Sequence, residues 1–480
     1  MLKKTLLASA VLGTLLLTAC NDSDSDESLK NAIDTLSTEG ASLPYSILRS
    51  DLIDADTQQP FEVRNGGFGS AMTAVPGETD QFYALTDRGP NATFTGNYGK
   101  GKKFPTPDYT PRIGQFKITD KGEIELVKEI LLKDRDGKNI SGLPNTSALG
   151  GTGETPYNAD GSPVLVDPSK AYNDNSASPD YNPLKLDDYG LDGEGLAALD
   201  DGTFWVSDEY GPHMVHFDAE GKEIGRINPF AGDARVTIHL PAEFANRRAN
   251  RGMEGLAITP DQTTLVGIMQ STMYNPNSSV KDLDITRIVT VNLQDGTIGQ
   301  YLYKQEKPQN SNSEIVAISA NEFLIIERDG SFLFGGPDGT DAATPDAQKH
   351  VYRIDLRNAT DLESVGTQGD FVQDADLGLL MNGSTLEEVV LNNGWDALTT
   401  AQIYPVSKEL VVDMVSAVEY PHDKMEGLWL IDDQHLGVLN DDDFATWSTS
   451  GELTQKMLND SDIDGNRLYI IKDLDLSPRD

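Results

Sequence analysis

A glutamate recurs at the start of an apolar run four times, at Glu194, Glu254, Glu314 and Glu426. The first three are sixty residues apart, which indicates a structural repeat. Because equivalent positions of a repeated fold lie on one ring, we expect these four carboxylates to converge. Carboxylates held close together raise each other's pKa unless a cation binds between them. The repeat therefore predicts a cation-binding ring.

Other acidic residues stand where strands are expected to end, and they would complete a calcium site. Ca²⁺ takes about six to eight oxygen ligands, most of them carboxylate or carbonyl oxygens. The ligands that we predict are Asp87, Glu194, Asp208, Glu209, Glu254, Glu426 and Asp441. In the competing interpretation, these acids only cap strand ends and pair with neighbouring bases.

Basic residues lie beside the predicted ligands: Arg88, Arg251 and Lys424 each stand within three positions of one of them. A bound cation together with arginine suits phosphoryl oxygens, because their charge neutralises the substrate and polarises phosphorus for attack by water. We therefore predict hydrolysis of a phosphoric ester, with these three bases holding the phosphate.

Two histidines accompany the same segments, and either His213 or His422 could protonate a leaving oxygen. We assign that role to His213, against the alternative that each is a polar loop residue. The sequence contains neither a Gly-x-Ser-x-Gly elbow nor a His-Glu-x-x-His pair. This absence disfavours hydrolases of the serine and zincin types.

The elements that must position these residues are short strands. Runs of β-branched and aromatic residues alternate with Gly, Asp and Asn about every ten residues, which is typical of an all-β fold. Each glutamate segment continues through a turn, such as Asp200-Asp201-Gly202, into three further strands. Four antiparallel strands repeated at a fixed period predict a β-propeller. Five copies are recognisable, including a looser one at residues 67–71, and we expect about six blades.

Two stretches interrupt the repeat, and we predict long loop insertions there. Residues 132–191 are rich in Gly, Pro, Asn and Ser, and residues 377–415 would hold either a diverged blade or helices. Insertions on one face of such a fold commonly shape a binding site. The last apolar run, residues 467–471, is predicted to pair with residues 45–52 and so to close the ring, which removes exposed sheet edges.

Four segments around the predicted site are distinctive as sequences: Thr86-Asp87-Arg88-Gly89-Pro90, Asp192-Gly193-Glu194-Gly195-Leu196, Ser207-Asp208-Glu209-Tyr210-Gly211-Pro212 and Arg251-Gly252-Met253-Glu254-Gly255. They resemble the phytase-like family, also described by an esterase-like activity of phytase, over most of residues 60–450. The resemblance implies a β-propeller and a calcium-dependent phosphoesterase activity.

The N-terminus indicates an exported bacterial lipoprotein. Two lysines precede an apolar run, Leu6 to Leu17, that is too short for a bilayer helix. A small-residue cleavage site follows and ends in Cys20, the only cysteine of the chain. We predict a lipoprotein signal peptide over residues 1–19, lipidation with palmitate at Cys20, an acidic disordered tether over residues 20–42 and the phytase-like β-propeller over residues 43–480. Asn21 favours the outer membrane of the cell envelope. The alternative is a secreted protein with a chance cysteine.

The charge balance limits the partners. Asp and Glu number 77 against 38 Lys and Arg, which gives a net charge of −39 at pH 7. A negative electrostatic field of this size repels nucleic acid and anionic lipid. We therefore expect no nucleic-acid partner, and we expect the protein to contact the membrane only through its lipid anchor. An anionic substrate must be met by local bases or bound cations.

Three functions remain open on the sequence alone. The leading hypothesis is a Ca²⁺-dependent phosphomonoesterase or phosphodiesterase that acts on a small-molecule phosphate ester at the cell envelope. The alternative is a non-catalytic propeller that binds a ligand or a protein partner and holds structural calcium, because fold does not fix function. A carboxylesterase ranks last, since no nucleophile motif occurs.

Overall fold

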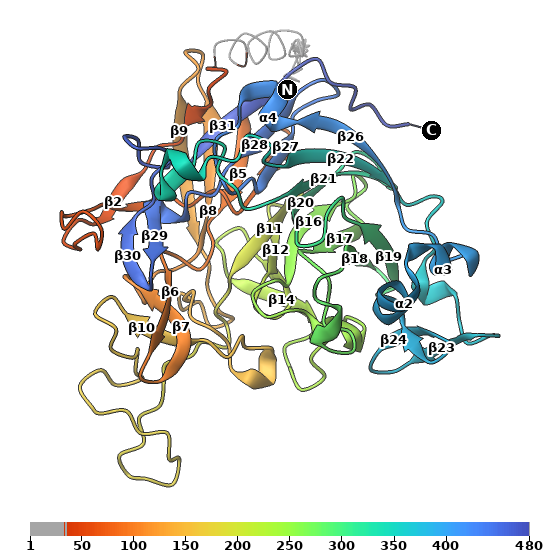
Figure 1. The fold of residues 1–480 in the computed structure, drawn as a ribbon, viewed down its shortest axis with the longest axis horizontal. Coiled ribbons are helices and arrows are strands. Elements are labelled where there is room, and N and C mark those ends of the chain that lie inside the picture. Colours follow the sequence, from red (N-terminus) through yellow and green to blue (C-terminus); the bar gives the residue numbers. More distant parts are fainter. Residues whose placement is uncertain (1–32, 34–35, 480) are drawn as a thin grey trace, which may run out of the picture.

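The computed structural model describes residue 33 and residues 36–479, and the fold is mostly β (Figure 1). Five sheets of four or five strands dominate it. In spatial order they are β4 (Ala71–Ala74), β5 (Gln81–Leu85), β8 (Arg112–Ile118) and β9 (Ile124–Leu131); β11 (Gly193–Ala198), β12 (Phe204–Asp208), β13 (Met214–Phe217), β14 (Glu223–Asn228) and β15 (Ile238–His239); β16 (Met253–Ile258), β17 (Thr264–Met269), β18 (Ile285–Asn292) and β19 (Ile298–Lys304); β20 (Ser311–Ala317), β21 (Glu322–Arg328), β22 (Lys349–Asp355) and β26 (Ser407–Asp413); and β27 (Gly427–Leu430), β28 (Leu436–Leu439), β31 (Arg467–Ile471) and β1 (Ala41–Ser42). All neighbours in these sheets are antiparallel except β14 and β15.

The five sheets are arranged in a ring around their first strands. β4, β11, β16, β20 and β27 contact one another in that order, and β27 also contacts β4. Figure 1 shows β11, β16 and β20 side by side near the centre of the molecule. One cluster of buried apolar side chains lies between each pair of neighbouring sheets. Between the last sheet and the first, for example, the rings of Phe82 and Trp429 have centroids 5.2 Å apart.

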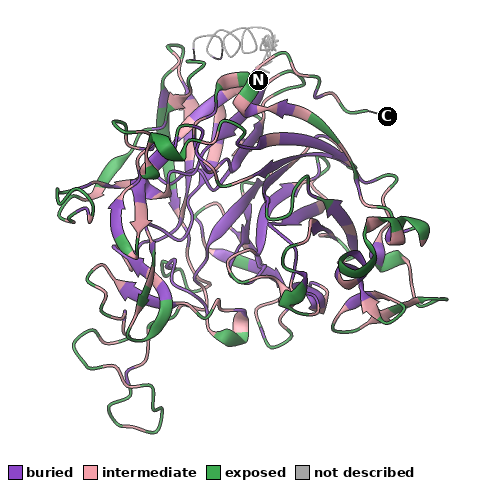
Figure 2. Cartoon of the chain, viewed as in Figure 1, coloured by how far each residue is buried: buried purple, intermediate pink, exposed green. Residues whose placement is uncertain are grey.

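The strands nearest the centre are buried on both faces, because a neighbouring sheet covers each side (Figure 2). Every residue of β11 and β12 is buried. The turn between these two strands is the one that its sequence predicts. Gly202 has φ +84°, a region that glycine adopts without steric cost, and Asp201 Oδ1 accepts a hydrogen bond from the Thr203 amide at 3.0 Å.

The all-β class predicted from the sequence is confirmed, whereas the expected number of about six blades stays a prediction. The described residues form five sheets of this kind. Residues 377–415, where the sequence allowed either a diverged blade or helices, contain a helical insertion. It is formed by α2 (Leu386–Asn393) and α3 (Trp395–Thr400) and is followed by β26. Since β26 pairs with β22, it is the outer strand of the fourth sheet.

The last sheet joins the two ends of the described chain. β31 pairs with β28 and also with β1, where Ala41 opposes Leu468. The predicted partner of β31 was therefore wrong, because residues 45–52 instead supply β2 (Ser46–Arg49), which pairs with β3 (Val63–Asn65). Gly40 permits the close approach of β1 to β31: its φ is +84°, and a Cβ there would lie 2.8 Å from the Tyr469 ring.

Part of the predicted tether packs against this sheet, since Leu36 is buried and β1 is paired. The predicted signal peptide and the lipidation site Cys20 lie outside the described residues. Within the described residues, none of the helices has the length and apolarity needed to cross a bilayer.

Smaller elements lie outside the ring. The strands are β2 with β3, β6 (Ala92–Gly96) with β7 (Gly99–Phe104) and β10 (Thr155–Asn158), β23 (Phe371–Asp374) with β24 (Gly378–Met381) and β25 (Ser384–Thr385), and β29 (Thr446–Thr449) with β30 (Glu452–Gln455). Within residues 36–479, the other helices are α4 (Met414–Val418) and the short 3₁₀ turns η1 (Ser147–Leu149), η2 (Ala242–Asn246), η3 (Ser278–Val280), η4 (Gly336–Asp338), η5 (Thr340–Ala342), η6 (Leu362–Ser364) and η7 (Asp443–Ala445).

Candidate active site

A cavity of about 860 Å³ lies where several of the central strands begin, and it is lined by seven acidic and five basic side chains. Eight of these were predicted from the sequence: Asp87, Arg88, Glu194, Glu209, Arg251, Glu254, Lys424 and Glu426. The other four are Lys102, Arg328, Asp423 and Asp443. Because these twelve come from widely separated parts of the chain, the closed arrangement of the sheets is what brings them together.

β-Bulges aim two of the repeated glutamates at the cavity. In β11 the residue left without a partner in the strand register is Glu194, and in β16 it is Glu254. A bulge turns its extra residue out of the regular alternation of side chains. In β20 the unpaired residue is Ser313, so Glu314 is one position out of phase with the other two glutamates.

Glu314 consequently does not line the cavity. Its Oε1 accepts hydrogen bonds from the amides of Leu256, at 3.2 Å, and Ile315, at 2.9 Å, and the side chain is buried between central strands. A shift of one residue along a strand sends a side chain to the opposite face. The expected convergence of four glutamates was therefore wrong for Glu314, while the other three do line the cavity.

The glycine that follows Glu194 and Glu254 has a separate purpose. A Cβ on Gly195 would lie 2.5 Å from the Leu256 nitrogen, and a Cβ on Gly255 would lie 2.6 Å from the Ile315 nitrogen. Neighbouring central strands thus approach backbone to backbone at these positions. In each Glu-Gly pair, the glutamate lines the cavity and the glycine allows the neighbouring central strand to pack closely.

One cluster of acids that could hold a metal ion consists of Asp192, Glu194 and Glu209. All three are buried, and one oxygen of each lies within 4.8 Å of the others. Asp192 was missed as a ligand, although it stands two residues before Glu194. Asp208, which was predicted as a ligand, does not line the cavity; its Oδ1 accepts from the Asp192 amide at 2.8 Å, so it positions Asp192 instead.

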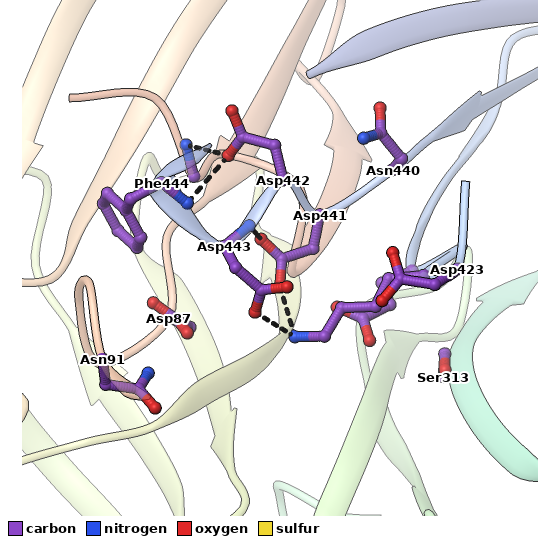
Figure 3. A network of polar contacts seen from close by, with 12 residues as sticks. Asp87, Asn91, Ser313, Asp423, Asn440, Asp441, Asp442, Asp443 and Phe444 are labelled. Atoms are coloured by element: carbon purple, nitrogen blue, oxygen red, sulfur yellow. Dashed lines mark hydrogen bonds and ion pairs between the residues drawn. The ribbon is translucent and has the colours of Figure 1, made fainter. Parts of the chain in front are cut away.

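The second cluster consists of Asp87, Asp441 and Asp443, which also have oxygens within 4.8 Å of one another (Figure 3). Lys424 Nζ donates to Asp441 Oδ2 at 2.6 Å and to Asp443 Oδ1 at 2.7 Å. Asp443 also receives Lys456 Nζ at 2.6 Å, from a lysine that is fully buried. The sequence signal for Asp443 was its place in the run Asn440-Asp441-Asp442-Asp443, two residues after a predicted ligand.

The carboxylates raise one another's pKa. Burial and the charge of Asp192 raise the pKa of Asp87 to about 8, and burial and the charge of Glu426 raise that of Glu254 to about 8. Burial followed by neighbouring carboxylates also raises the pKa of Glu194 and of Glu209 well above the usual range. The site therefore favours either protons or a cation among these oxygens.

The basic residues divide into paired and unpaired groups. Arg88 lies 3.2 Å from Asp192 and 3.4 Å from Glu154, and Arg328 is paired with Glu426. Lys424 is held by the second cluster. Among the described residues lining the cavity, Lys102 and Arg251 are the cations that form no ion pair. Arg251 Nη1 is buried without a hydrogen-bond partner, so its charge is available to an anion.

Neither histidine lines the cavity. His213 is fully buried against Phe230, at 5.6 Å between ring centroids, and neither ring nitrogen has a hydrogen-bond partner. Burial, reinforced by Arg226, lowers the pKa of His213 well below its usual value. His422 lies 2.6 Å from Asp464 and 2.9 Å from the Tyr469 hydroxyl, inside the fold.

The donor set fits a hard divalent cation. Glu254 Oε2 and Glu426 Oε2 are buried oxygens without hydrogen-bond partners, and the first acidic cluster adds three carboxylates. In the second cluster, Lys424 and Lys456 already neutralise part of the charge of Asp441 and Asp443. Such oxygens are the ligands that Ca²⁺ and Mg²⁺ prefer. Together with the unpaired Arg251 and Lys102, the cavity can bind a cation and an anion side by side.

Comparison with known proteins identifies a family over most of the chain. The sequence profile of the phytase-like family, described as "esterase-like activity of phytase", matches residues 63–444. A protein of Arthroderma benhamiae, named an uncharacterized secreted protein, is 26% identical over an aligned region that covers 60% of this chain and 65% of the relative. The chain thus spans about 65% of the length of that relative.

Solved structures are more distant. A luciferin-regenerating enzyme is 8% identical with a TM-score of 0.30, over 84% of this chain and 78% of its own. The PQQ-bound aldose sugar dehydrogenase of Streptomyces coelicolor is 10% identical with a TM-score of 0.29, over 90% of this chain and 99% of its own. Likeness at this level does not inform the function of the chain.

Proposed function

The chain belongs to the phytase-like family, and we propose that it is a Ca²⁺-dependent hydrolase of phosphoric esters. The family description indicates an ester-cleaving enzyme, and the phosphoric ester is our assignment. The observation that carries it is the cavity itself, in which the buried oxygens Glu254 Oε2 and Glu426 Oε2 and the buried nitrogen Arg251 Nη1 all lack hydrogen-bond partners.

The two acidic clusters are the candidate cation sites. Asp192, Glu194 and Glu209 form the first candidate site. Asp87, Asp441 and Asp443 form the second, where a cation would have to displace Lys424 or Lys456 from Asp441 and Asp443. Bound Ca²⁺ would supply positive charge that neutralises and polarises a phosphoryl group. Asp208 holds the backbone that carries Asp192, and therefore it supports the first site without being a ligand.

The protein's own cations would bind and orient the phosphate. Arg251 offers an unpartnered guanidinium nitrogen, and charge-assisted hydrogen bonds of this kind are among the strong ones. Arg88 and Lys424, which were predicted as phosphate ligands, are already held by carboxylates. Their contribution would be to fix Asp192 and Asp443 in place and to reduce the negative charge that a phosphate meets.

Glu254 is the best candidate for moving a proton. Gln270 Nε2 donates to Glu254 Oε1 at 2.6 Å, which orients the carboxyl group and leaves Oε2 without a partner. A pKa of about 8 lets this group exchange a proton near neutral pH, as general acid–base catalysis requires. Glu254 thus replaces His213, which does not line the cavity.

We also propose that the five sheets are blades of a β-propeller. Each of the five sheets starts with a strand at the centre, and a buried apolar cluster lies in each of the five gaps. We further propose that the protein works at the cell envelope, anchored through Cys20. Mass spectrometry of the mature N-terminus tests the anchor: a diacylated Cys20 supports it, and an unmodified N-terminus contradicts it.

The test separates metal binding from catalysis. Purified protein is stripped with a chelator and titrated with Ca²⁺ by calorimetry, and phosphate release from a panel of phosphomonoesters and phosphodiesters is measured in parallel. We expect Glu209→Gln to lose a Ca²⁺ site and activity together, and Glu254→Gln to lose activity while keeping Ca²⁺. The control is Glu306→Gln, which removes the same charge from a largely exposed side chain outside the cavity.

Two results would count against the proposal in different ways. Ca²⁺ binding without phosphate release from any ester would favour the ligand-binding propeller that the sequence left open. Phosphate release that is unaffected by chelation or by Glu209→Gln would preserve a phosphoesterase but remove the cation from it.

A further inference from the structure

The second acidic cluster already contains two ammonium groups. Lys424 Nζ lies 2.6 Å from Asp441 Oδ2 and 2.7 Å from Asp443 Oδ1. Lys456 Nζ lies 2.6 Å from the other oxygen of Asp443, Oδ2. Each oxygen of Asp443 thus faces a different lysine. Because two positive charges stand against the carboxylates of Asp441 and Asp443, the cluster attracts a further cation only weakly.

The surroundings of Lys456 resemble the ligand shell of a cation. Its side chain is fully buried. Besides the contact with Asp443, its Nζ lies 3.0 Å from Asp423 Oδ1, 3.4 Å from Asp464 Oδ2 and 3.2 Å from the carbonyl oxygen of Asp441. A metal ion that displaced this ammonium group would leave a charge buried without its partners, which is strongly unfavourable. The oxygens around Lys456 are therefore not free to bind a metal ion.

The backbone that carries Asp443 is strained. Asp443, Phe444 and Ala445 have φ values of +48°, +58° and +56°, in the left-handed region that residues other than glycine rarely adopt. Figure 3 shows the bracing of this turn by Asp442, whose Oδ1 accepts hydrogen bonds from the Phe444 amide at 3.1 Å and the Gly67 amide at 3.0 Å. Strain of this kind persists only where the surrounding structure imposes it, and it is concentrated at functional sites. The strained turn fixes Asp443 between the two lysines.

The first acidic cluster differs from the second in its partners, although it also has three carboxylates. Among the described residues, Glu194 and Glu209 form no ion pair with a basic side chain. Arg88 pairs with Asp192 alone of this cluster, at 3.2 Å. Ca²⁺ binds carboxylate oxygens as its preferred ligands, and only those without another cation are available to it. The two clusters should therefore differ in their affinity for Ca²⁺.

We propose that Lys424 and Lys456 take the place of a second metal ion in the cluster of Asp87, Asp441 and Asp443, so that only the first of the two clusters binds Ca²⁺. This inference rests on the proposed function, and it assigns the source of positive charge on one side of the cavity. Lys424 lines the cavity, and 28% of its side chain is exposed. This side of the cavity consequently keeps its positive charge when the protein is stripped of metal.

Removal of Lys424 should create a second Ca²⁺ site. In Lys424→Ala, Asp441 and Asp443 lose an ammonium partner, and with Asp87 they form three carboxylates close enough to share an ion. Calorimetric titration of the chelator-stripped full chain should then give one more bound Ca²⁺ than the wild type. The double variant Lys424→Ala/Asp441→Asn should lose that additional ion.

Lys100→Ala is the matched control, because it removes the same charge from an exposed side chain outside the cavity. It should bind as many Ca²⁺ ions as the wild type. A folded Lys424→Ala protein that also keeps the wild-type number of ions would overturn the proposal.

Removal of single carboxylates tests the same point in a chain that keeps both lysines, and it does not depend on the folding of Lys424→Ala. Asp441→Asn should leave the number of bound Ca²⁺ ions unchanged, whereas Glu209→Gln should lower it by one. Loss of an ion in Asp441→Asn would show that the second cluster binds Ca²⁺ beside its lysines, contrary to the proposal.

Stability gives a measurement that is independent of activity. Lys424→Ala should lower the urea midpoint of unfolding in chelator, because it leaves buried carboxylates without a partner. Ca²⁺ should raise that midpoint again, and the increase should be roughly twice that of the wild type, since two sites rather than one stabilise the folded state. Equal increases in the variant and the wild type would contradict the gain of a site.

The outcomes separate this inference from the proposed function. If the wild type binds no Ca²⁺ but Lys424→Ala gains an ion, the proposed Ca²⁺ dependence fails and the assignment of the lysines stands. If the wild type loses one ion in Glu209→Gln and another in Asp441→Asn, the Ca²⁺ dependence stands and the assignment of the lysines fails.

Discussion

At the scale of single residues, the cavity is organised by which charges already have partners. Lys424 lies between two carboxylates, and Arg88 contacts Asp192 and Glu154. Replacing such a residue removes an internal ion pair and leaves a buried carboxylate alone, which destabilises the fold. Arg251 is different, because it forms no ion pair among the described residues and its loss leaves no carboxylate unpaired.

Arg251 is therefore the residue whose replacement reports most directly on phosphate binding. We expect Arg251→Gln to lower kcat/KM for phosphate esters by about 10- to 100-fold, the equivalent of a charged hydrogen bond of about 1.5–3 kcal/mol, with little change in the urea midpoint of unfolding. Arg248→Gln is the control, since Arg248 donates to Gln309 and does not line the cavity. Similar losses in both variants would show that general surface charge, rather than a contact at Arg251, is responsible.

At the scale of elements, register decides which glutamates reach the cavity. The bulges of β11 and β16 project Glu194 and Glu254, whereas the bulge of β20 projects Ser313. The sequence repeat shows where the strands begin, but it does not show which residue of a strand is the bulged one. That choice depends on how a strand pairs with its neighbour in the same sheet and how closely the next sheet approaches.

Because central strands approach closely at Gly255, a methyl group added there should destabilise the fold, whereas one added at an open glycine should not. In Gly255→Ala the new Cβ would lie 2.6–2.8 Å from backbone atoms of the next sheet. These backbone atoms cannot move away without disturbing the strand that contains them. We expect a loss of at least about 2 kcal/mol in the free energy of unfolding, measured by urea denaturation. Gly232→Ala, where a Cβ meets nothing within 4 Å, is the control and should be near neutral. A Gly255→Ala protein of unchanged stability would contradict the packing of the ring.

At the scale of the whole molecule, closure of the ring concentrates acidic groups in its interior. Burial raises the pKa of Asp87 and Glu254 to about 8 and that of Asp208 and Asp442 to about 7. An unperturbed carboxyl group has a pKa of about 4. Between about pH 4 and the raised pKa, these four groups are therefore protonated in the metal-free fold but ionised in the unfolded chain. Their stabilising contribution is complete below about pH 4 and is lost as the pH rises through 7 to 8.

The metal-free protein should accordingly become less stable between pH 5 and pH 8, and Ca²⁺ should restore stability most strongly at pH 8. The measurement is urea unfolding in chelator and in Ca²⁺ at each pH. Because deprotonated carboxylates bind the cation, the difference between the two curves should grow with pH. A constant or shrinking difference would mean that Ca²⁺ does not bind at these carboxylates.

Local sequence patterns predict the all-β class, strand turns such as Asp200-Asp201-Gly202, and eight of the twelve charged residues that line the cavity. These features were accessible because they are local: β-branched runs, turn residues and acids at strand starts repeat along the chain. The helical insertion was one of two alternatives, and spacing alone could not choose between them.

The other features of the site depend on tertiary contacts. Lys102 and Trp447 reach the cavity through hairpins that no local pattern connects with the glutamate repeat, and β31 pairs with β1 rather than with the longer run that follows it. Glu314 does not line the cavity because the bulge of its strand differs by one residue, and His213 is buried among its neighbours. Each of these outcomes depends on contacts between residues far apart in the sequence, and propensity and periodicity carry no information about such contacts.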